Sequence, residues 1–279
     1  MTDSTMSPLT ALDGENIAVL DWPLDDNVRS RGTVLIVHGL GEYAGRYHVL
    51  AEWLNAKGFA VRAHDQYGHG QSDGVRGDLP SASRFLDDLA DVVDSTRRHM
   101  FKDKPLILLG HSMGGLVASQ FAVHGLRHID GLVLSSPAFD PGLGPFQKWL
   151  LSQLLRWMPH VRVGNGLKIA HLCRDKAVVA AYQRDPLVHP HITARLADWI
   201  SVAGAQSIAA ATGWRVPSLL LYAGADKLVN PEGSRAFAQA APKTVVQAQC
   251  FAQMFHEIFN EPDKEDALAV LALWLKRFP

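Results

Sequence analysis

The sequence has few cysteines and no excess of charge of one sign. Its two cysteines, Cys173 and Cys250, lie far apart and lack the close spacing of zinc ligands. A single disulfide between the two is retained as an alternative. A framework of several disulfides is excluded, and a reducing compartment is expected. The 27 basic and 28 acidic residues give a formal net charge of −1. The chain therefore has no basic field with which to bind nucleic acid or anionic lipid.

A long hydrophobic run is also missing. No stretch of about 18 apolar residues is present, so a membrane-spanning helix is not expected. The N-terminal sequence MTDSTMSPLTALDGEN is polar and lacks the basic start and apolar centre of a secretory signal. We therefore expect a cytoplasmic protein. Its 279 residues, 47% of them hydrophobic, suffice for a large core in one or two domains.

Strand-like and helix-like segments alternate along the chain. Near-continuous runs of valine, isoleucine and leucine are typical of strands covered on both faces. Such runs occupy residues 33–39, 58–65, 105–111, 131–137, 217–224 and 244–251. Helical patterns occupy 46–57, 83–100, 231–240 and 266–278. This alternation predicts an α/β fold with a mostly parallel central sheet and helices on both faces.

The segment 139–213 interrupts the alternation, because it has helical patterns but no convincing strand. We predict a helical cap inserted after the strand 131–137, on a core formed by residues 1–138 and 214–279. Ordinary core helices are the alternative. A stretch rich in leucine and tryptophan contains Trp149, Leu150, Leu154, Leu155 and Trp157. Packing of this stretch on the core is the favoured interpretation, and transient contact with a membrane or micelle is the alternative.

Residues 110–115, GHSMGG, follow the strand-like run PLILL and precede a helical pattern. Residues 110–114 fit G-x-S-x-G, the strand-turn-helix motif that exposes a nucleophilic serine in α/β-hydrolases. Glycines two residues away on either side relieve the crowding of that sharp turn. The motif in this context predicts that Ser112 is a nucleophile. The adjacent His111 should point elsewhere, as a packed or hydrogen-bonded neighbour.

A nucleophilic serine needs a base, and the base needs a carboxylate that orients it. In this fold the chain order is serine, acid, histidine. Of the 13 histidines, only His256 lies beyond the last predicted strands, so we predict that it is the base. Asp226 directly follows the strand 217–224, at the edge where open α/β sheets place functional groups. It is the predicted acid, and Asp185 and Asp198 are its rivals.

Acyl transfer also needs hydrogen-bond donors for the oxyanion. The backbone N–H of Met113, the residue after the nucleophile, is one predicted donor. The second is the N–H of Leu40, in the sequence HGLGE that follows the first predicted strand.

The stretches HGLGEYAGRY, AHDQYGHGQSDG, GHSMGG, YQRDPL and AGADKLV together resemble the monoacylglycerol lipase and lysophospholipase family of serine α/β-hydrolases. The resemblance implies a serine esterase with a helical cap over an acyl pocket and with no metal or other cofactor. It implies the same three catalytic residues as the motif and the chain order do. It further implies that Glu42 and Arg46 shape the site and that Tyr182 reaches the polar end of the substrate. For these three residues, an ion pair or a packed ring is an equal alternative.

The sequence departs from the family pattern at two places. Gly41-Glu42-Tyr43 stands where the family often has GEH, and Phe259 stands where animal members have a second histidine. The stretch FHEIFNE is closer to bacterial members. Recognition of the head group is therefore expected to differ.

The expected reaction is hydrolysis of a lipid ester, most simply a monoacylglycerol, through an acyl-serine intermediate. A lysophospholipase and a general carboxylesterase are the alternatives within this chemistry, and a non-catalytic lipid-binding protein is the alternative outside it. The expected ligand is a small lipid ester, with no nucleic acid, and the oligomeric state is left open.

Overall fold

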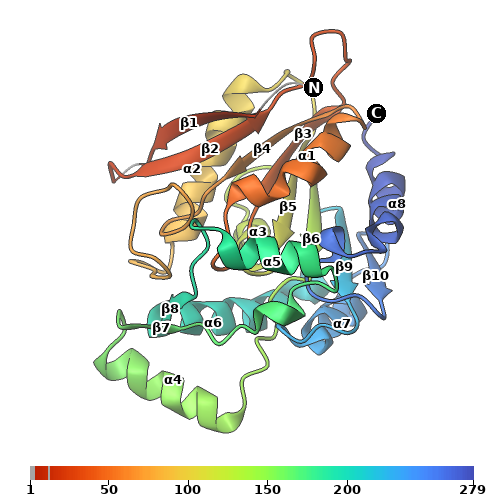
Figure 1. Cartoon of the computed structure of the whole chain (residues 1–279). Coiled ribbons are helices and arrows are strands. Elements are labelled where there is room, and N and C mark those ends of the chain that lie inside the picture. Colours follow the sequence, from red (N-terminus) through yellow and green to blue (C-terminus); the bar gives the residue numbers. More distant parts are fainter. Residues whose placement is uncertain (1–3, 12) are drawn as a thin grey trace.

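The computed structural model describes residues 4–11 and 13–279. Its centre is an eight-stranded sheet in the order β1-β2-β4-β3-β5-β6-β9-β10 (Figure 1). The strands are β1 (Thr5–Thr10), β2 (Asn16–Trp22), β3 (Gly32–Val37), β4 (Phe59–His64), β5 (Leu106–His111), β6 (Gly131–Ser135), β9 (Ser218–Ala223) and β10 (Val246–Phe251). All neighbours from β4 to β10 pair in parallel, whereas β1–β2 and β2–β4 are antiparallel. The six predicted strands are confirmed as β3, β4, β5, β6, β9 and β10.

Helices cover both faces of the sheet. They are α1 (His48–Asn55), α2 (Arg84–His99), α3 (Met113–His124), α4 (Pro145–Trp157), α5 (Lys176–Arg184), α6 (Ala194–Ala210), α7 (Pro231–Ala240) and α8 (Lys264–Leu275). One buried cluster joins the sheet to α1 and α8, and a second joins its other face to α2, α3, α6 and α7. This arrangement confirms the predicted α/β fold. Within the described residues, no helix is long and apolar enough to cross a bilayer.

The antiparallel pair β1–β2 at the edge of the sheet was not expected from the sequence. β1 is almost entirely exposed and contains Pro8, so it has no apolar run by which to recognise it. Proline is tolerated at such an edge because its missing N–H costs no hydrogen bond inside the sheet. The strand therefore depends on its pairing with β2 rather than on its own composition.

The segment between β6 and β9 contains α4, α5 and α6, and also two short strands. β7 (Arg162–Gly164) and β8 (His191–Thr193) form an antiparallel pair, so the expectation that this segment has no strand is wrong. Three residues are too few to show a hydrophobic period, and each strand exists only through its partner. The pair therefore could not be recognised from the sequence.

Helix α4 lies at the edge of the molecule and has no buried residue (Figure 1). Leu154 and Leu155 are half-buried, whereas Trp149 is 57%, Leu150 42% and Trp157 70% exposed. The favoured interpretation, packing on the core, is thus wrong for these last three residues. The helix packs against α6.

Candidate active site

Ser112 occupies the sharp turn between β5 and α3. Its backbone has φ 54° and ψ −119°, a conformation that is costly for a residue with a side chain. The turn also needs its glycines, because a Cβ on Gly114 would lie 2.1 Å from the carbonyl oxygen of Val37. A Cβ on Gly110 would lie 2.5 Å from the carbonyl oxygen of Gly114. The structure thus confirms the strand-turn-helix interpretation of GHSMGG.

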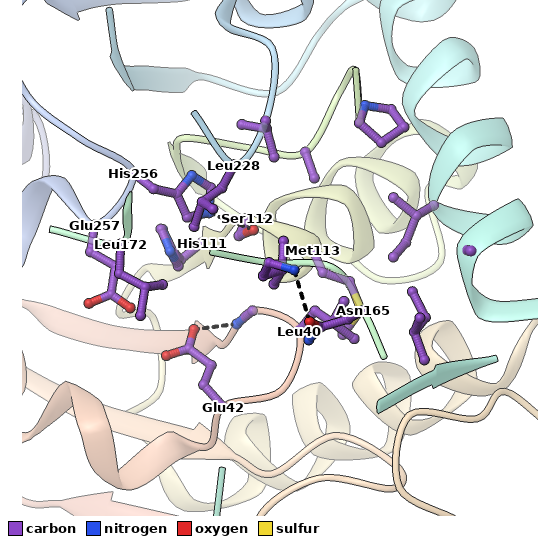
Figure 2. A pocket seen from close by; sticks show the side chains of 18 of the residues that line it. Leu40, Glu42, His111, Ser112, Met113, Asn165, Leu172, Leu228, His256 and Glu257 are labelled. Carbon is purple, nitrogen blue, oxygen red and sulfur yellow. Dashed lines mark hydrogen bonds between the residues drawn. The ribbon is translucent and has the colours of Figure 1, made fainter. Parts of the chain in front are cut away.

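The structure brings Ser112, His256 and Asp226 together. The Ser112 hydroxyl lies 2.8 Å from Nε2 of His256 (Figure 2). Nδ1 of that ring lies 2.6 Å from Oδ2 of Asp226. Oδ1 of Asp226 accepts hydrogen bonds from the backbone N–H groups of Leu228 and Val229, at 2.8 and 3.1 Å. The carboxylate is thereby fixed on one side and free to hold the imidazole on the other.

The three residues come from loops at the same edge of the sheet. Asp226 follows β9 and His256 follows β10, while Ser112 follows β5. Because parallel strands end at a common edge, residues far apart in the chain meet there. The rival acid Asp185 instead accepts a hydrogen bond from the Tyr43 hydroxyl at 2.7 Å.

Burial and neighbouring charges shift the pKa values of His256 and Asp226 in opposite directions. Burial alone would lower the pKa of His256, but the Asp226 carboxylate, with smaller effects of Glu257 and Glu42, raises that pKa. Burial alone would raise the pKa of Asp226, but His256 and the two backbone N–H groups lower it. The arrangement therefore stabilises a protonated imidazole next to an ionised carboxylate.

Two backbone N–H groups lie beside Ser112 without an acceptor. Met113 is the first residue of α3, so its N–H has no partner within the helix. Neither this group nor the N–H of Leu40 donates a hydrogen bond to any residue that the structure describes. Both residues line the same cavity as Ser112, and Figure 2 labels all three. These are the two donors that the sequence predicted for an oxyanion.

Gly39 lets the Leu40 loop pass close to the serine. A Cβ at this position would lie 3.1 Å from the Cβ of Ser112 and 2.9 Å from Oε1 of Glu42. The Gly39 N–H donates a 2.6 Å hydrogen bond to that same oxygen. Glu42 therefore holds the loop that carries one of the two free N–H groups.

The site opens into a cavity of about 910 Å³, its mouth included. Most of its wall is apolar, contributed by Leu143, Leu167, Leu172, Ile192, Ile200, Leu228 and Val229 among others. One end is polar and is formed by Glu42, Arg46, Tyr182 and Glu257. The cavity thus has an apolar body and a charged end, with Ser112 exposed in its wall.

At the polar end, one guanidinium lies between two buried carboxylates. Nη1 and Nη2 of Arg46 donate to the two oxygens of Glu257 at 2.7 and 2.8 Å, and Nη1 also donates to Glu42. The ring of Tyr182 lies 4.6 Å from the guanidinium carbon. The Tyr47 hydroxyl donates to Glu42 at 2.7 Å. The resemblance implies that Glu42, Arg46 and Tyr182 lie at the site, and all three line the cavity. Glu42 and Arg46 also form an ion pair, and Tyr182 packs its ring on Arg46.

Burial alone would raise the pKa of Glu42, but Arg46, with smaller effects of His111 and His38, lowers it to about 2. This carboxylate is therefore ionised at neutral pH. Glu257 was missed by the sequence reasoning. The sequence feature that could have indicated Glu257 is its position immediately after the predicted base, in FHEIFNE.

His111 is the packed neighbour that the sequence predicted. Its Nδ1 lies 3.1 Å from the carbonyl oxygen of Ser135, and its ring centroid lies 4.8 Å from that of His256. Burial, with a smaller effect of His256, lowers its pKa to about 4. His111 is therefore neutral beside the base. Among the described residues, no group of three or more His, Cys, Asp or Glu side chains is arranged to hold a metal ion.

Comparison with known proteins agrees with this geometry. Residues 28–263 match the family described as serine aminopeptidase, S33. The chain is 32% identical over 283 residues to the monoacylglycerol lipase of Mycolicibacterium smegmatis, covering 99% of each. It is 32% identical over 280 residues to an uncharacterized abhydrolase domain-containing protein of Dictyostelium discoideum, covering 99% of this chain and 29% of that protein.

A solved structure matches as well. The crystal structure of Paleococcus ferrophilus monoacylglycerol lipase superimposes with a TM-score of 0.82 at 32% identity, covering 94% of this chain and 99% of that chain. The family match and the lipase relatives each extend over most of the chain. The chain therefore belongs to the S33 family of serine α/β-hydrolases, in the branch that includes the monoacylglycerol lipases.

Proposed function

We propose that this protein hydrolyses monoacylglycerols to glycerol and a fatty acid through an acyl-serine intermediate. The observation that carries the proposal is the hydrogen-bonded chain Asp226–His256–Ser112, which ends in the wall of a largely apolar cavity with a polar end. The segment 139–213 acts as the cap of this cavity. In support, it contributes Leu167, Tyr182 and Ile192 to the wall opposite the sheet.

In the first half of the reaction, Ser112 Oγ attacks the ester carbonyl carbon and transfers its proton to Nε2 of His256. Asp226 holds the imidazole with Nδ1–H pointing at its carboxylate and stabilises the imidazolium. The N–H groups of Leu40 and Met113 bind the oxyanion, and each such donor is worth roughly 3 kcal/mol in the transition state. The tetrahedral intermediate then expels the alcohol, which takes the proton from Nε2.

In the second half, a water molecule takes the place of the alcohol. His256 removes one of its protons, and the resulting hydroxide attacks the acyl carbon, again with its oxyanion on the same two N–H groups. Collapse breaks the bond to Ser112 Oγ, which regains its proton from Nε2. The fatty acid leaves and the enzyme returns to its starting state.

The apolar wall predicts a preference for longer acyl chains. Each buried methylene contributes about 0.8 kcal/mol, so the four extra methylenes of glyceryl monooctanoate over monobutyrate raise kcat/KM by up to about 200-fold. The measurement is the ratio of kcat/KM for the two esters, taken below their critical micelle concentrations. A ratio below one would leave a general carboxylesterase instead. A lysophospholipase would cleave lysophosphatidylcholine of the same acyl chain faster than the glyceryl ester.

Helix α4 provides the contact with a lipid surface through which such a substrate enters. Its exposed side chains include Phe146 at 71%, Trp149 at 57% and Trp157 at 70%, and Phe146 stacks on Trp149 with ring centroids 5.8 Å apart. Aromatic residues on one face of a surface helix favour the interface between lipid head groups and acyl chains. The chain on either side of α4 lines the cavity, through Leu143 before the helix and Leu167 after it.

Replacing Trp149 and Trp157 together by serine should weaken binding to neutral phosphatidylcholine vesicles. Burial of one large apolar side chain is worth about 1.5–3 kcal/mol, so the pair accounts for roughly 100-fold or more in partition coefficient. The measurement is cosedimentation with vesicles. The matched control replaces two exposed apolar residues away from α4, Val49 and Leu273, by serine. Equal losses in both double variants would contradict a specific role for α4.

A further inference from the structure

The charged groups at the polar end of the cavity do not cancel. Three acidic or basic side chains line it, namely Glu42, Arg46 and Glu257, and Arg46 is the one Lys or Arg among the described lining residues. Two carboxylates face one guanidinium, which leaves a net charge of −1. All three side chains are at most 11% exposed, so water screens this charge poorly.

The positive charge of Arg46 is already paired with two carboxylates. Nη1 and Nη2 donate to the two carboxylates, and the ring of Tyr182 covers its face. A phosphate would need a free cationic fork or unpaired backbone N–H groups. The unpaired backbone N–H groups of Leu40 and Met113 are required by the reacting carbonyl. An anionic head group would therefore meet a net negative charge at this end of the cavity.

The same end has spare hydrogen-bond acceptors. Oε1 of Glu257 accepts one hydrogen bond from Arg46, and Oε2 of Glu42 likewise accepts one from Arg46. A carboxylate oxygen has about two acceptor sites, so each retains one. Such acceptors suit a head group with hydroxyl donors or a positive charge.

We propose that the buried Glu42–Arg46–Glu257 cluster selects lipid esters with neutral or cationic head groups and rejects anionic ones, with Glu257 as the specificity-determining residue. The inference rests on the proposed ester hydrolysis and names the substrate class within it. Glu257 is the residue to test because its carboxylate supplies the excess negative charge. Glu42 also holds the Gly39 N–H and so affects the oxyanion loop.

Two pairs of oleoyl esters measure the charge preference. Oleoylcholine and 3,3-dimethylbutyl oleate have the same shape and differ by one positive charge. In the wild-type protein, kcat/KM should be about tenfold higher for the choline ester, as expected for a unit charge in a poorly screened field. Monooleoylglycerol should exceed oleoyl lysophosphatidate by about 100-fold. In Glu257→Gln, which retains an acceptor for Arg46, the choline ratio should fall by about tenfold. The glycerol-to-lysophosphatidate ratio should fall by at least as much, because the phosphate carries about −1.5 to −2 charges.

Glu261→Gln is the matched control. Glu261 is a buried carboxylate in the same loop, paired with Arg174, and it does not line the cavity. Its replacement should leave both ratios unchanged. Because each ratio compares two substrates on one protein, partial loss of folded protein cancels.

The outcomes separate the two proposals. Absence of monooleoylglycerol cleavage by the wild type would overturn the proposed function itself. Cleavage with a choline-to-dimethylbutyl ratio of one or less would overturn charge selection, even if Glu257→Gln failed to fold. A tenfold ratio that survives in Glu257→Gln would remove Glu257 as the determinant. Glu257 would then serve only to position Arg46.

Discussion

Replacement of Ser112 by alanine should lower kcat for monoacylglycerol hydrolysis by about 10⁶-fold, the loss typical of a missing serine nucleophile. In the proposed reaction, the Ser112 hydroxyl forms the only covalent bond between the enzyme and the acyl group. Alanine keeps the Cβ in the same strained turn, so the fold should be retained. The measurement is kcat alongside the thermal midpoint, which should change by no more than about 2 °C.

The same variant tests the non-catalytic alternative. A fluorophosphonate probe reacts with an activated serine and should label the wild-type protein but not Ser112→Ala. A protein that only binds lipid would remain unlabelled in both forms. Full hydrolytic activity in Ser112→Ala would exclude the mechanism that we propose.

Asp226→Asn should lower kcat by about 10⁴-fold. The asparagine amide donates a hydrogen bond to Nδ1 of His256, which turns the ring into the tautomer whose Nε2 carries the proton. That nitrogen can then no longer accept the proton of Ser112. The measurement is kcat at pH 8, with the thermal midpoint as a check on folding. Asp185→Asn is the control, because this rival acid contacts Tyr43 and not His256, and its activity should stay close to that of the wild type.

The pH dependence of kcat/KM provides a second test of Asp226→Asn. The base works only when neutral, so kcat/KM falls as the pH decreases through the pKa of His256. Asp226 raises that pKa above its ordinary value of 6.5, and the acidic limb of the wild type should therefore lie above pH 6.5. Without the carboxylate charge, burial lowers the pKa, and the limb of Asp226→Asn should move to lower pH. A limb that stays in place or moves upward would contradict the assignment of His256 and Asp226.

The sequence alone predicted the features that depend on residues close together in the chain. The elbow around Ser112 is visible because glycines two residues away on either side are a local steric need. The strands are visible because burial on both faces requires unbroken apolar runs. The order serine, acid, histidine selected His256, and the position directly after a predicted strand selected Asp226 over Asp185 and Asp198. The structure places Asp226 and His256 in contact. Their catalytic roles remain predictions.

The tertiary structure decided what depends on residues far apart in the chain. Arg46 meets Glu257 across 211 positions, and no local pattern could predict that this carboxylate would close the polar end of the cavity. The exposure of Trp149 and Trp157 was likewise not visible, because an amphipathic pattern does not say whether another element covers the apolar side. Local sterics and hydrophobic periodicity belong to a stretch of sequence, whereas ion-pair partners and exposure arise only when distant stretches pack together.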